Sequence, residues 1–229
     1  MRAKEIQRQP IRSFVLRSSR LTPAQARAID TLWPVYGINH CESVVDFNAV
    51  FGRPAPLVME IGFGNGDALV EMAKAEPEAN FIGIEVHKPG VGAVLAKIDA
   101  AGLANVRIIS EDAVPVLQNM IAPKSLSGLR LYFPDPWPKK RHHKRRLVQP
   151  QFLELVAGRL IKGVVIHMAT DWENYAEQMF QLLDESPRYC NTVAAGGFAE
   201  RPAWRPLTHF EKRGTRLGHG VWDILFTRC

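Results

Sequence analysis

Hydrophobic and polar positions change period repeatedly along the chain, which indicates strands and helices in alternation. Short apolar runs predict buried strands over residues 57–61, 81–85, 105–110, 129–133 and 163–169. Apolar residues spaced three and four apart predict helices over residues 67–75, 91–101 and 113–121, from residue 150 onward, and from about residue 171 to 185. This alternation favours right-handed crossovers and a mostly parallel sheet with helices on both faces.

The start of the chain departs from this alternation. Thr22 followed by Pro23 predicts a helix that ends near Trp33, because Thr is a good N-cap and Pro suits the first helical position. Residues 36–56 show no clear period and are expected to be irregular.

The C-terminal part holds two expected strands, over residues 189–193 and 221–227, separated by a Pro- and Arg-rich loop over 201–220. No full helix lies between these strands, which predicts an antiparallel edge on a sheet of seven strands in all. We therefore expect a basic N-terminal arm and helix over residues 1–36, followed by one α/β domain over residues 37–229.

The composition of the chain indicates an anionic partner. With 229 residues, 46% of them hydrophobic, the chain can bury a full core. Its formal net charge of +6 favours nucleic acid or an anionic membrane surface. No apolar run approaches the length of a bilayer span and the N-terminus lacks a signal-peptide core, so we expect no membrane association.

Cys41, Cys190 and Cys229 are odd in number, far apart in sequence and without metal-type spacing. This usage favours a reducing cytoplasm and argues against a disulfide or a structural zinc site. His142 and His143 lack carboxylate or cysteine partners at a suitable spacing, so we expect no bound metal.

A glycine-rich loop follows the strand over 57–61. Gly62, Gly64 and Gly66 let the backbone turn sharply and approach a ligand closely. A dinucleotide-binding loop needs its third glycine one residue later, where this chain has Asp67. That acid disfavours a pyrophosphate and favours a cationic ligand, and Glu60 just before the loop has the same effect.

Acids also end the next two strands. Glu85 stands where doubly wound folds place the carboxylate that accepts hydrogen bonds from ribose hydroxyls. Asp112 can accept from an adenine amino group. Each acid alone is usually only a solvated loop end, but three acids after consecutive strands beside one glycine loop predict an adenosyl ligand. S-adenosyl-L-methionine fits best, because its sulfonium and ammonium groups are both positive.

The strand over 129–133 runs into Pro134-Asp135-Pro136-Trp137-Pro138, whose prolines cannot continue a sheet ladder. Asp135 is therefore expected to be held stiffly at the carboxyl edge of the sheet, facing the methyl donor. Trp137 offers a flat surface on which a base could stack, and a buried Trp in a rigid turn is the alternative.

A basic run over residues 139–146 follows, with six Lys and Arg and two His. The other 23 Lys and Arg equal the 23 Asp and Glu, so this run can account for the whole formal excess of charge. Such a run can be a solvated face or a nuclear-localisation patch, but beside a pocket it predicts contact with a polyanion and a strong salt dependence.

Three segments resemble the bacterial tRNA (guanine-N7)-methyltransferase family. They are Glu60 to Gly66, Phe133 to Arg146 with its highly specific Pro-Asp-Pro-Trp motif, and Thr208 to Gly214. The resemblance covers most of the chain, beginning at the segment Arg12 to Arg17. It implies a class I S-adenosylmethionine-dependent methyltransferase fold, which is Rossmann-like, and methyl transfer to N7 of the variable-loop guanine at position 46 of tRNA.

The resemblance also implies roles for individual residues, and Asp135 is the expected catalytic residue. The expected cofactor-binding residues are Glu60, Gly62, Gly64, Gly66, Glu85, Asp112 and Asp135. The expected substrate contacts are Lys139, Asp171, Thr208, His209, Phe210 and Glu211. The expected RNA contacts are Arg141, His142, His143, Lys144, Arg145 and Arg146. Asp171 could instead cap a helix, and Glu211 could instead pair with a neighbouring arginine.

Other functions remain open at the level of sequence. An NAD-dependent oxidoreductase also needs glycines and an acid after the second strand, although Asp67 stands against it. A non-catalytic RNA-binding protein could keep the same fold, and a small-molecule methyltransferase would leave the basic run unexplained. A monomer and a homodimer are both compatible with the sequence.

Overall fold

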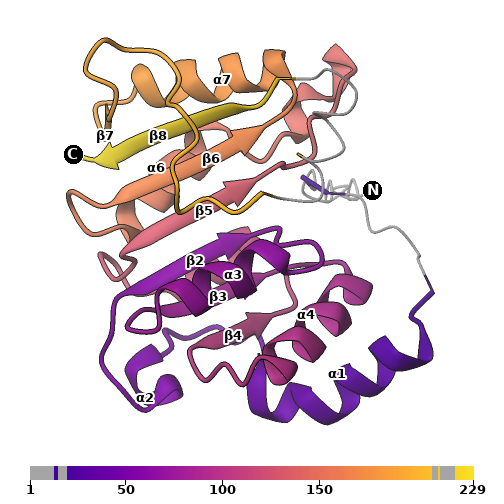
Figure 1. Ribbon diagram of the computed structural model, residues 1–229. Helices are drawn as coiled ribbons and strands as arrows, with labels where there is room; N and C mark the ends of the chain where they lie inside the picture. Colours follow the sequence, from indigo (N-terminus) through magenta and orange to yellow (C-terminus); the bar gives the residue numbers. More distant parts are fainter. Residues whose placement is uncertain (1–12, 15–19, 208–210, 212–219) are drawn as a thin grey trace, which may run out of the picture.

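The structure, a computed structural model, describes residues 13–14, 20–207, 211 and 220–229. Within them an eight-stranded sheet runs in the order β1-β4-β3-β2-β5-β6-β8-β7 (Figure 1). β8 is antiparallel to both of its neighbours, and the other pairs are parallel. The strands are β1 (Gly37–Ile38), β2 (Leu57–Ile61), β3 (Asn80–Ile84), β4 (Val106–Ile109), β5 (Gly128–Tyr132), β6 (Val165–Thr170), β7 (Tyr189–Asn191) and β8 (Trp222–Arg228). The expected α/β fold with an antiparallel edge is confirmed.

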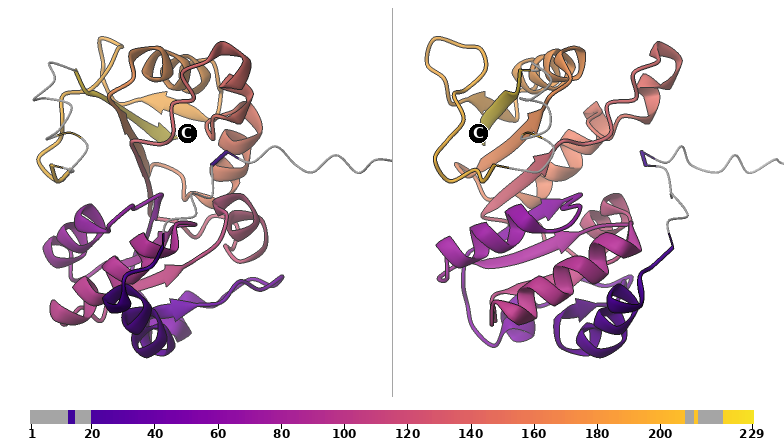
Figure 2. Two further views of the ribbon diagram at one scale, coloured as in Figure 1. Left: turned by 90° about the vertical axis from the view of Figure 1, so that its right-hand side faces the viewer. Right: turned by 45° about the vertical axis from the view of Figure 1, so that its right-hand side comes forward.

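Helices cover both faces of the sheet (Figure 2). One face carries α1 (Pro23–Tyr36), α3 (Asp67–Ala75) and α4 (Lys88–Ala100). The other carries α2 (Phe47–Phe51), α5 (Ala113–Asn119), α6 (Pro150–Arg159) and α7 (Glu173–Asp184). None of the helices in the described part of the chain is long and apolar enough to cross a bilayer.

The segment over 36–56 is more regular than its sequence indicates. β1 pairs with β4 through Gly37 and Ile38, which adds an eighth strand to the seven expected. The helix α2 is capped by Asp46, whose side chain accepts from two backbone N–H groups, and it ends at Gly52 in the left-handed region. A two-residue strand has no period of its own, so only its pairing with β4 identifies it.

The N-terminal helix α1 continues to Tyr36, past the end expected at Trp33. It packs along α4, and a Cβ atom on Gly92 would lie 2.7 Å from the backbone oxygen of Gln25. The boundary expected between residues 36 and 37 therefore falls where α1 passes directly into β1.

Two smaller expectations were wrong. Asp171 does not cap α7, because Trp172 occupies the N-cap position and no side chain caps the helix there. Cys190 and Cys229 are joined by a disulfide, with a Cα–Cα distance of 5.9 Å, although we expected none. The antiparallel pairing of β7 with β8 brings together two cysteines that are 39 residues apart in sequence.

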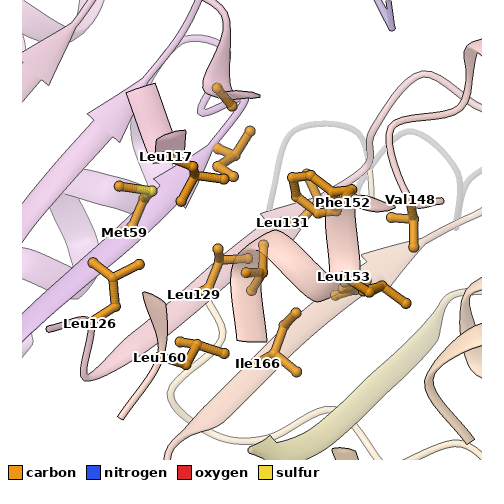
Figure 3. Packing of buried hydrophobic residues seen from close by; sticks show 14 of the residues in the cluster. Met59, Leu117, Leu126, Leu129, Leu131, Val148, Phe152, Leu153, Leu160 and Ile166 are labelled. Carbon is orange, nitrogen blue, oxygen red and sulfur yellow. The ribbon is translucent and has the colours of Figure 1, made fainter. Parts of the chain in front are cut away.

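The sheet presents different chemistry on its two faces around β5. Leu129 and Leu131 point into an apolar core formed with α5 and α6, shown in Figure 3. Arg130 and Tyr132 alternate with them and point to the opposite face. There the chain after β7 crosses β8, β6 and β5 (Figure 1). The apolar core thus fixes β5 from behind, and its far face is left for polar groups.

Candidate active site

A pocket of about 420 Å³ opens at the carboxyl ends of β2, β3, β4 and β5. Its size is in the range of pockets that bind cofactors and other small molecules. Most of the predicted cofactor-binding residues line it, namely Glu60, Gly62, Gly64, Glu85, Asp112 and Asp135. Because β2 lies between β3 and β5, the glycine loop after β2 stands between the acids of both neighbours. The sheet order thus brings together the residues that the sequence places far apart.

The glycine loop is held by the acid at the end of β3. Gly62 and Gly64 have φ angles of 74° and 58°, which disfavour any residue with a side chain. The Glu85 carboxylate accepts from the N–H of Gly64 at 2.9 Å, and from the N–H groups of Val86 and His87 at 2.8 and 2.9 Å. Three of its roughly four acceptor positions are therefore used within the protein.

Gly66 is not among the residues of the pocket wall. Its φ is 78°, and a Cβ atom there would lie 2.1 Å from Cγ2 of Val94. Glycine is therefore required at this position to start α3 and to let α4 approach. Lys97 of α4 bonds the Asn65 carbonyl at 2.9 Å and Asp67 at 2.5 Å, so the acid that was expected to repel a pyrophosphate already has a cationic partner.

Glu60 is the most deeply enclosed acid of the pocket wall, with 2% of its surface exposed. Burial raises its pKa to about 8, while the cation of Arg130 on the neighbouring strand lowers it and Glu85 raises it further. Its Oε2 atom has no hydrogen-bond partner among the described residues. A buried carboxyl oxygen without a partner beside a pocket fits a cationic or hydrogen-bond-donating ligand group.

Asp112 contributes to the wall from the start of α5. One of its oxygens caps the helix by accepting from the Val114 N–H at 3.0 Å. The helix cap and the pocket wall therefore share one carboxylate, and the cap orients it.

Asp135 is exposed and stands in a loop with unusual backbone geometry. Phe133 and Trp137 on either side of it have φ angles of 51° and 45°, a region that costs a residue with a side chain on the order of 1–3 kcal/mol. The Phe133 N–H bonds the Ala169 carbonyl at 2.8 Å, and the Trp137 indole bonds the Ser13 carbonyl at 2.9 Å. Strain of this kind persists only when neighbouring groups fix the loop.

The Trp137 ring already contacts the basic run over residues 139–146, which is called the basic segment from here on. The Arg145 guanidinium lies 4.5 Å above it, and His142 meets its edge with the ring centroids 5.8 Å apart. A base that stacks on Trp137 would therefore have to use the face that Arg145 does not cover.

The basic segment forms a short 3-10 helix, η1 (Lys140–Arg145), which the sequence did not predict. The side chains of Lys139, Lys140, Arg141 and Lys144 are exposed, while those of His142, His143 and Arg145 are half-buried. Arg146 differs, because only 2% of its surface is exposed. Among the residues that the structure describes, no three His, Cys, Asp or Glu are grouped as metal ligands.

The remaining predicted substrate contacts are not part of the pocket wall. Lys139 precedes η1, and half-buried Asp171 follows β6. Glu211 is buried and accepts from the Arg205 guanidinium at 2.6 and 2.9 Å, the arginine pairing that was the alternative to a guanine contact. Residues 208–210, which include three further predicted contacts, lie outside the described residues.

A buried chain of polar side chains continues from Arg205 to the pocket. Arg205 donates to Asp223 at 3.0 Å, and Asp223 lies 2.7 Å from Nε2 of His167. Nδ1 of His167 lies 3.1 Å from the hydroxyl of Tyr132, which lines the pocket. Burial lowers the pKa of His167, so the neutral ring carries its proton on Nε2 and accepts from Tyr132 at Nδ1.

Sequence reasoning missed this chain of residues and one part of the wall. A histidine inside an otherwise apolar strand was the available signal for the first. Ser13 and Phe14 line the pocket with the strand-end acids, and the resemblance over residues 12–17 was the only signal for them.

Comparison with known proteins agrees with this geometry. The family described as "Putative methyltransferase" matches residues 54–224. The tRNA (guanine-N(7)-)-methyltransferases of Psychromonas ingrahamii and Aeromonas hydrophila are 61% and 58% identical over 218 residues. These alignments cover 95% of this chain and 89% and 92% of the relatives.

Solved structures share the fold at low sequence identity. The 16S rRNA methyltransferase KamB has a TM-score of 0.59 at 15% identity, over 82% of this chain and 96% of its own. TrmN from Thermus thermophilus has a TM-score of 0.54 at 16% identity, over 77% and 45% of the two chains. The relatives at 61% and 58% identity are tRNA (guanine-N(7)-)-methyltransferases and the matching family is one of methyltransferases, so the comparisons give no support to the oxidoreductase and RNA-binding alternatives. With a pocket of strand-end acids around a glycine loop and relatives that match it over nearly its whole length, the chain belongs to the tRNA (guanine-N(7)-)-methyltransferase family.

Proposed function

We propose that the protein transfers the methyl group of S-adenosyl-L-methionine to N7 of a guanine in tRNA, with the variable-loop guanine at position 46 as the target. The observation that carries the proposal is that Asp135 shares one pocket with the glycine loop, Glu85 and Asp112, directly before the basic segment. Since tRNA is the substrate, we place the activity in the cytoplasm.

The pocket wall fits the cofactor. When bound, S-adenosyl-L-methionine supplies a methyl group activated by a positively charged sulfur. Glu60 would hold the ammonium group, because its Oε2 has no partner among the described residues. Glu85 retains about one acceptor position, which suits one ribose hydroxyl. Asp112 uses one oxygen to cap α5 and can accept from the adenine amino group with the other.

Methyl transfer requires mainly that the protein align the methyl group with N7 of guanine. N7 of guanine carries an in-plane lone pair and no proton, so the displacement needs no general base. The purine gains positive charge as the new bond forms, and a carboxylate held nearby stabilises that charge. Asp135, fixed between two residues of left-handed backbone, has this role in the proposal.

The exposed cations would bring the tRNA to the pocket. Arg141 and Lys144 present their charges to solvent and would contact phosphates. Lys139, exposed just before η1, and Asp171, directly after β6, would contact the incoming nucleotide. Glu211 is buried and its carboxylate accepts from the Arg205 guanidinium, so a guanine contact there would compete with this pair.

A direct assay tests the proposal. The protein is incubated with unmodified tRNA and methyl-labelled cofactor, and the product is cleaved at 7-methylguanine to map the site. We expect one labelled site in the variable loop, and its loss when position 46 of the tRNA is changed to adenine. Labelling that survives this change, or binding of tRNA without any transfer, would contradict the proposal.

A further inference from the structure

The last cation of the basic segment, Arg146, points into the protein. Only 2% of its surface is exposed, whereas Arg141 and Lys144 in the same segment are exposed. A phosphate could reach the Arg146 guanidinium only after it left its present surroundings. Its place in the sequence therefore suggests an RNA contact, and its place in the fold does not.

The guanidinium of Arg146 joins the Asp135 loop to α7. Its Nε donates to the carbonyl of Pro136 at 2.8 Å. On the other side, its terminal nitrogens donate to Oε1 of Gln178 at 2.6 Å and to Oδ1 of Asn174 at 3.0 Å. The ring of Tyr175, also on α7, lies 4.6 Å from the guanidinium carbon. One planar cation thus binds two separate parts of the chain.

The loop needs such a brace. Phe133 and Trp137 adopt a costly left-handed backbone, and the prolines between them have no N–H with which to bind the rest of the protein. The Pro136 carbonyl belongs to the peptide between Pro136 and Trp137, one residue after Asp135, so a charged donor on it restrains the turn that carries Asp135. Hydrogen bonds from a charged donor are about twice as strong as neutral ones.

We propose that Arg146 is a positioning residue for methyl transfer, holding the Asp135 loop against α7, and that it does not contact RNA. The inference rests on the proposed role of Asp135. It predicts that Asn174 and Gln178, the uncharged partners of Arg146 on α7, also support the methyl-transfer step, although they lie in a different part of the chain.

The test compares Arg146→Gln with Arg141→Gln, a matched change at an exposed cation of the same segment. We measure kcat and KM for tRNA, the salt dependence of tRNA binding and the affinity for S-adenosyl-L-methionine. Arg146→Gln should lower kcat about tenfold or more and leave the salt slope unchanged. Arg141→Gln, which removes a proposed phosphate contact, should raise KM for tRNA and reduce the slope by about 0.7–0.9.

A second pair of variants distinguishes the loss of positioning from a general loss of folding. Gln178→Ala and Asn174→Ala each remove one acceptor of Arg146 without changing the charge of the protein. Each should lower kcat with unchanged tRNA binding, and Arg146→Lys should recover part of the activity, because an ammonium can donate to one side of the bridge.

Hydrogen exchange gives a readout that does not depend on tRNA methylation. Residues 133–145 should exchange faster in Arg146→Gln than in the wild type, while β2 and β3 stay protected. If the wild type methylated no tRNA, the proposed function would fail and this exchange result could still stand. The inference is overturned if Arg146→Gln lowers the salt slope of tRNA binding and keeps the wild-type kcat. It is also overturned if the kcat of Arg146→Gln, counted per cofactor-binding site, equals that of the wild type.

Discussion

Replacing Glu60 with Gln should make the protein more stable and less able to bind its cofactor. Burial raises the pKa of the Glu60 carboxyl from 4.5 to about 8, and only 2% of the residue is exposed. One pKa unit corresponds to about 1.4 kcal/mol, so ionising this group in the fold costs on the order of 5 kcal/mol. Gln keeps the shape of the side chain and removes that cost.

The sign of the pH dependence follows from which state binds the proton. Between pH 4.5 and about 8 the folded protein holds a proton on Glu60 and the unfolded chain does not. The wild type therefore loses stability as pH rises through this range and levels off above it. From pH 6 to pH 8, the advantage of Glu60→Gln in free energy of unfolding should grow by about 2 kcal/mol.

Urea unfolding at pH 6, 7, 8 and 9 measures this difference. Glu71→Gln, an exposed glutamate on the neighbouring helix α3, is the matched control and should show no such growth. A difference between wild type and Glu60→Gln that is independent of pH, or a less stable variant at pH 8, would refute the reasoning.

Cofactor binding provides a second test of the protonation of Glu60. A cationic ligand next to Glu60 favours its charged form, so binding at pH 7 should release a proton from the wild type and none from Glu60→Gln. Calorimetry in two buffers of different ionisation enthalpy counts that proton. Equal proton release from both proteins would show that another group responds to the ligand.

Asp135→Asn should lower kcat about a hundredfold while cofactor affinity stays within a few-fold, and steady-state kinetics with full activity would remove Asp135 from the mechanism. Arg141→Glu combined with Lys144→Glu should weaken tRNA binding and reduce its salt slope by about 1.5, and an unchanged slope in a binding titration would exclude phosphate contact there. Phe14→Ala should weaken cofactor binding about tenfold through lost apolar contact, and equal affinities by calorimetry would place Phe14 outside the site. Burial lowers the pKa of His167 below 6.5, so the wild type should lose stability as pH falls below about 6.5 and His167→Gln should lose less; parallel unfolding curves from pH 7 to 5 would contradict this.

Local patterns were enough to predict most of the fold. The strand over 57–61 and the helix over 67–75 were predicted with the bounds that the structure has, because a short apolar run and the helical spacing of apolar residues are both local signals. The positions of Glu85 and Asp112 at strand ends were predictable for the same reason. Once parallel strands are expected, their carboxyl ends must share one edge, so the pocket of acids follows from the sequence.

Contacts between distant segments were decided only by the tertiary structure. Arg146 belongs by sequence to a basic run, yet α7 supplies the partners that bury it. Cys190 and Cys229 meet because β7 and β8 pair, and Phe14, which precedes all the strands in sequence, lines the pocket at their carboxyl ends. A sequence pattern specifies which face of an element is buried but not which element lies against it, and the role of each of these residues depends on that neighbour.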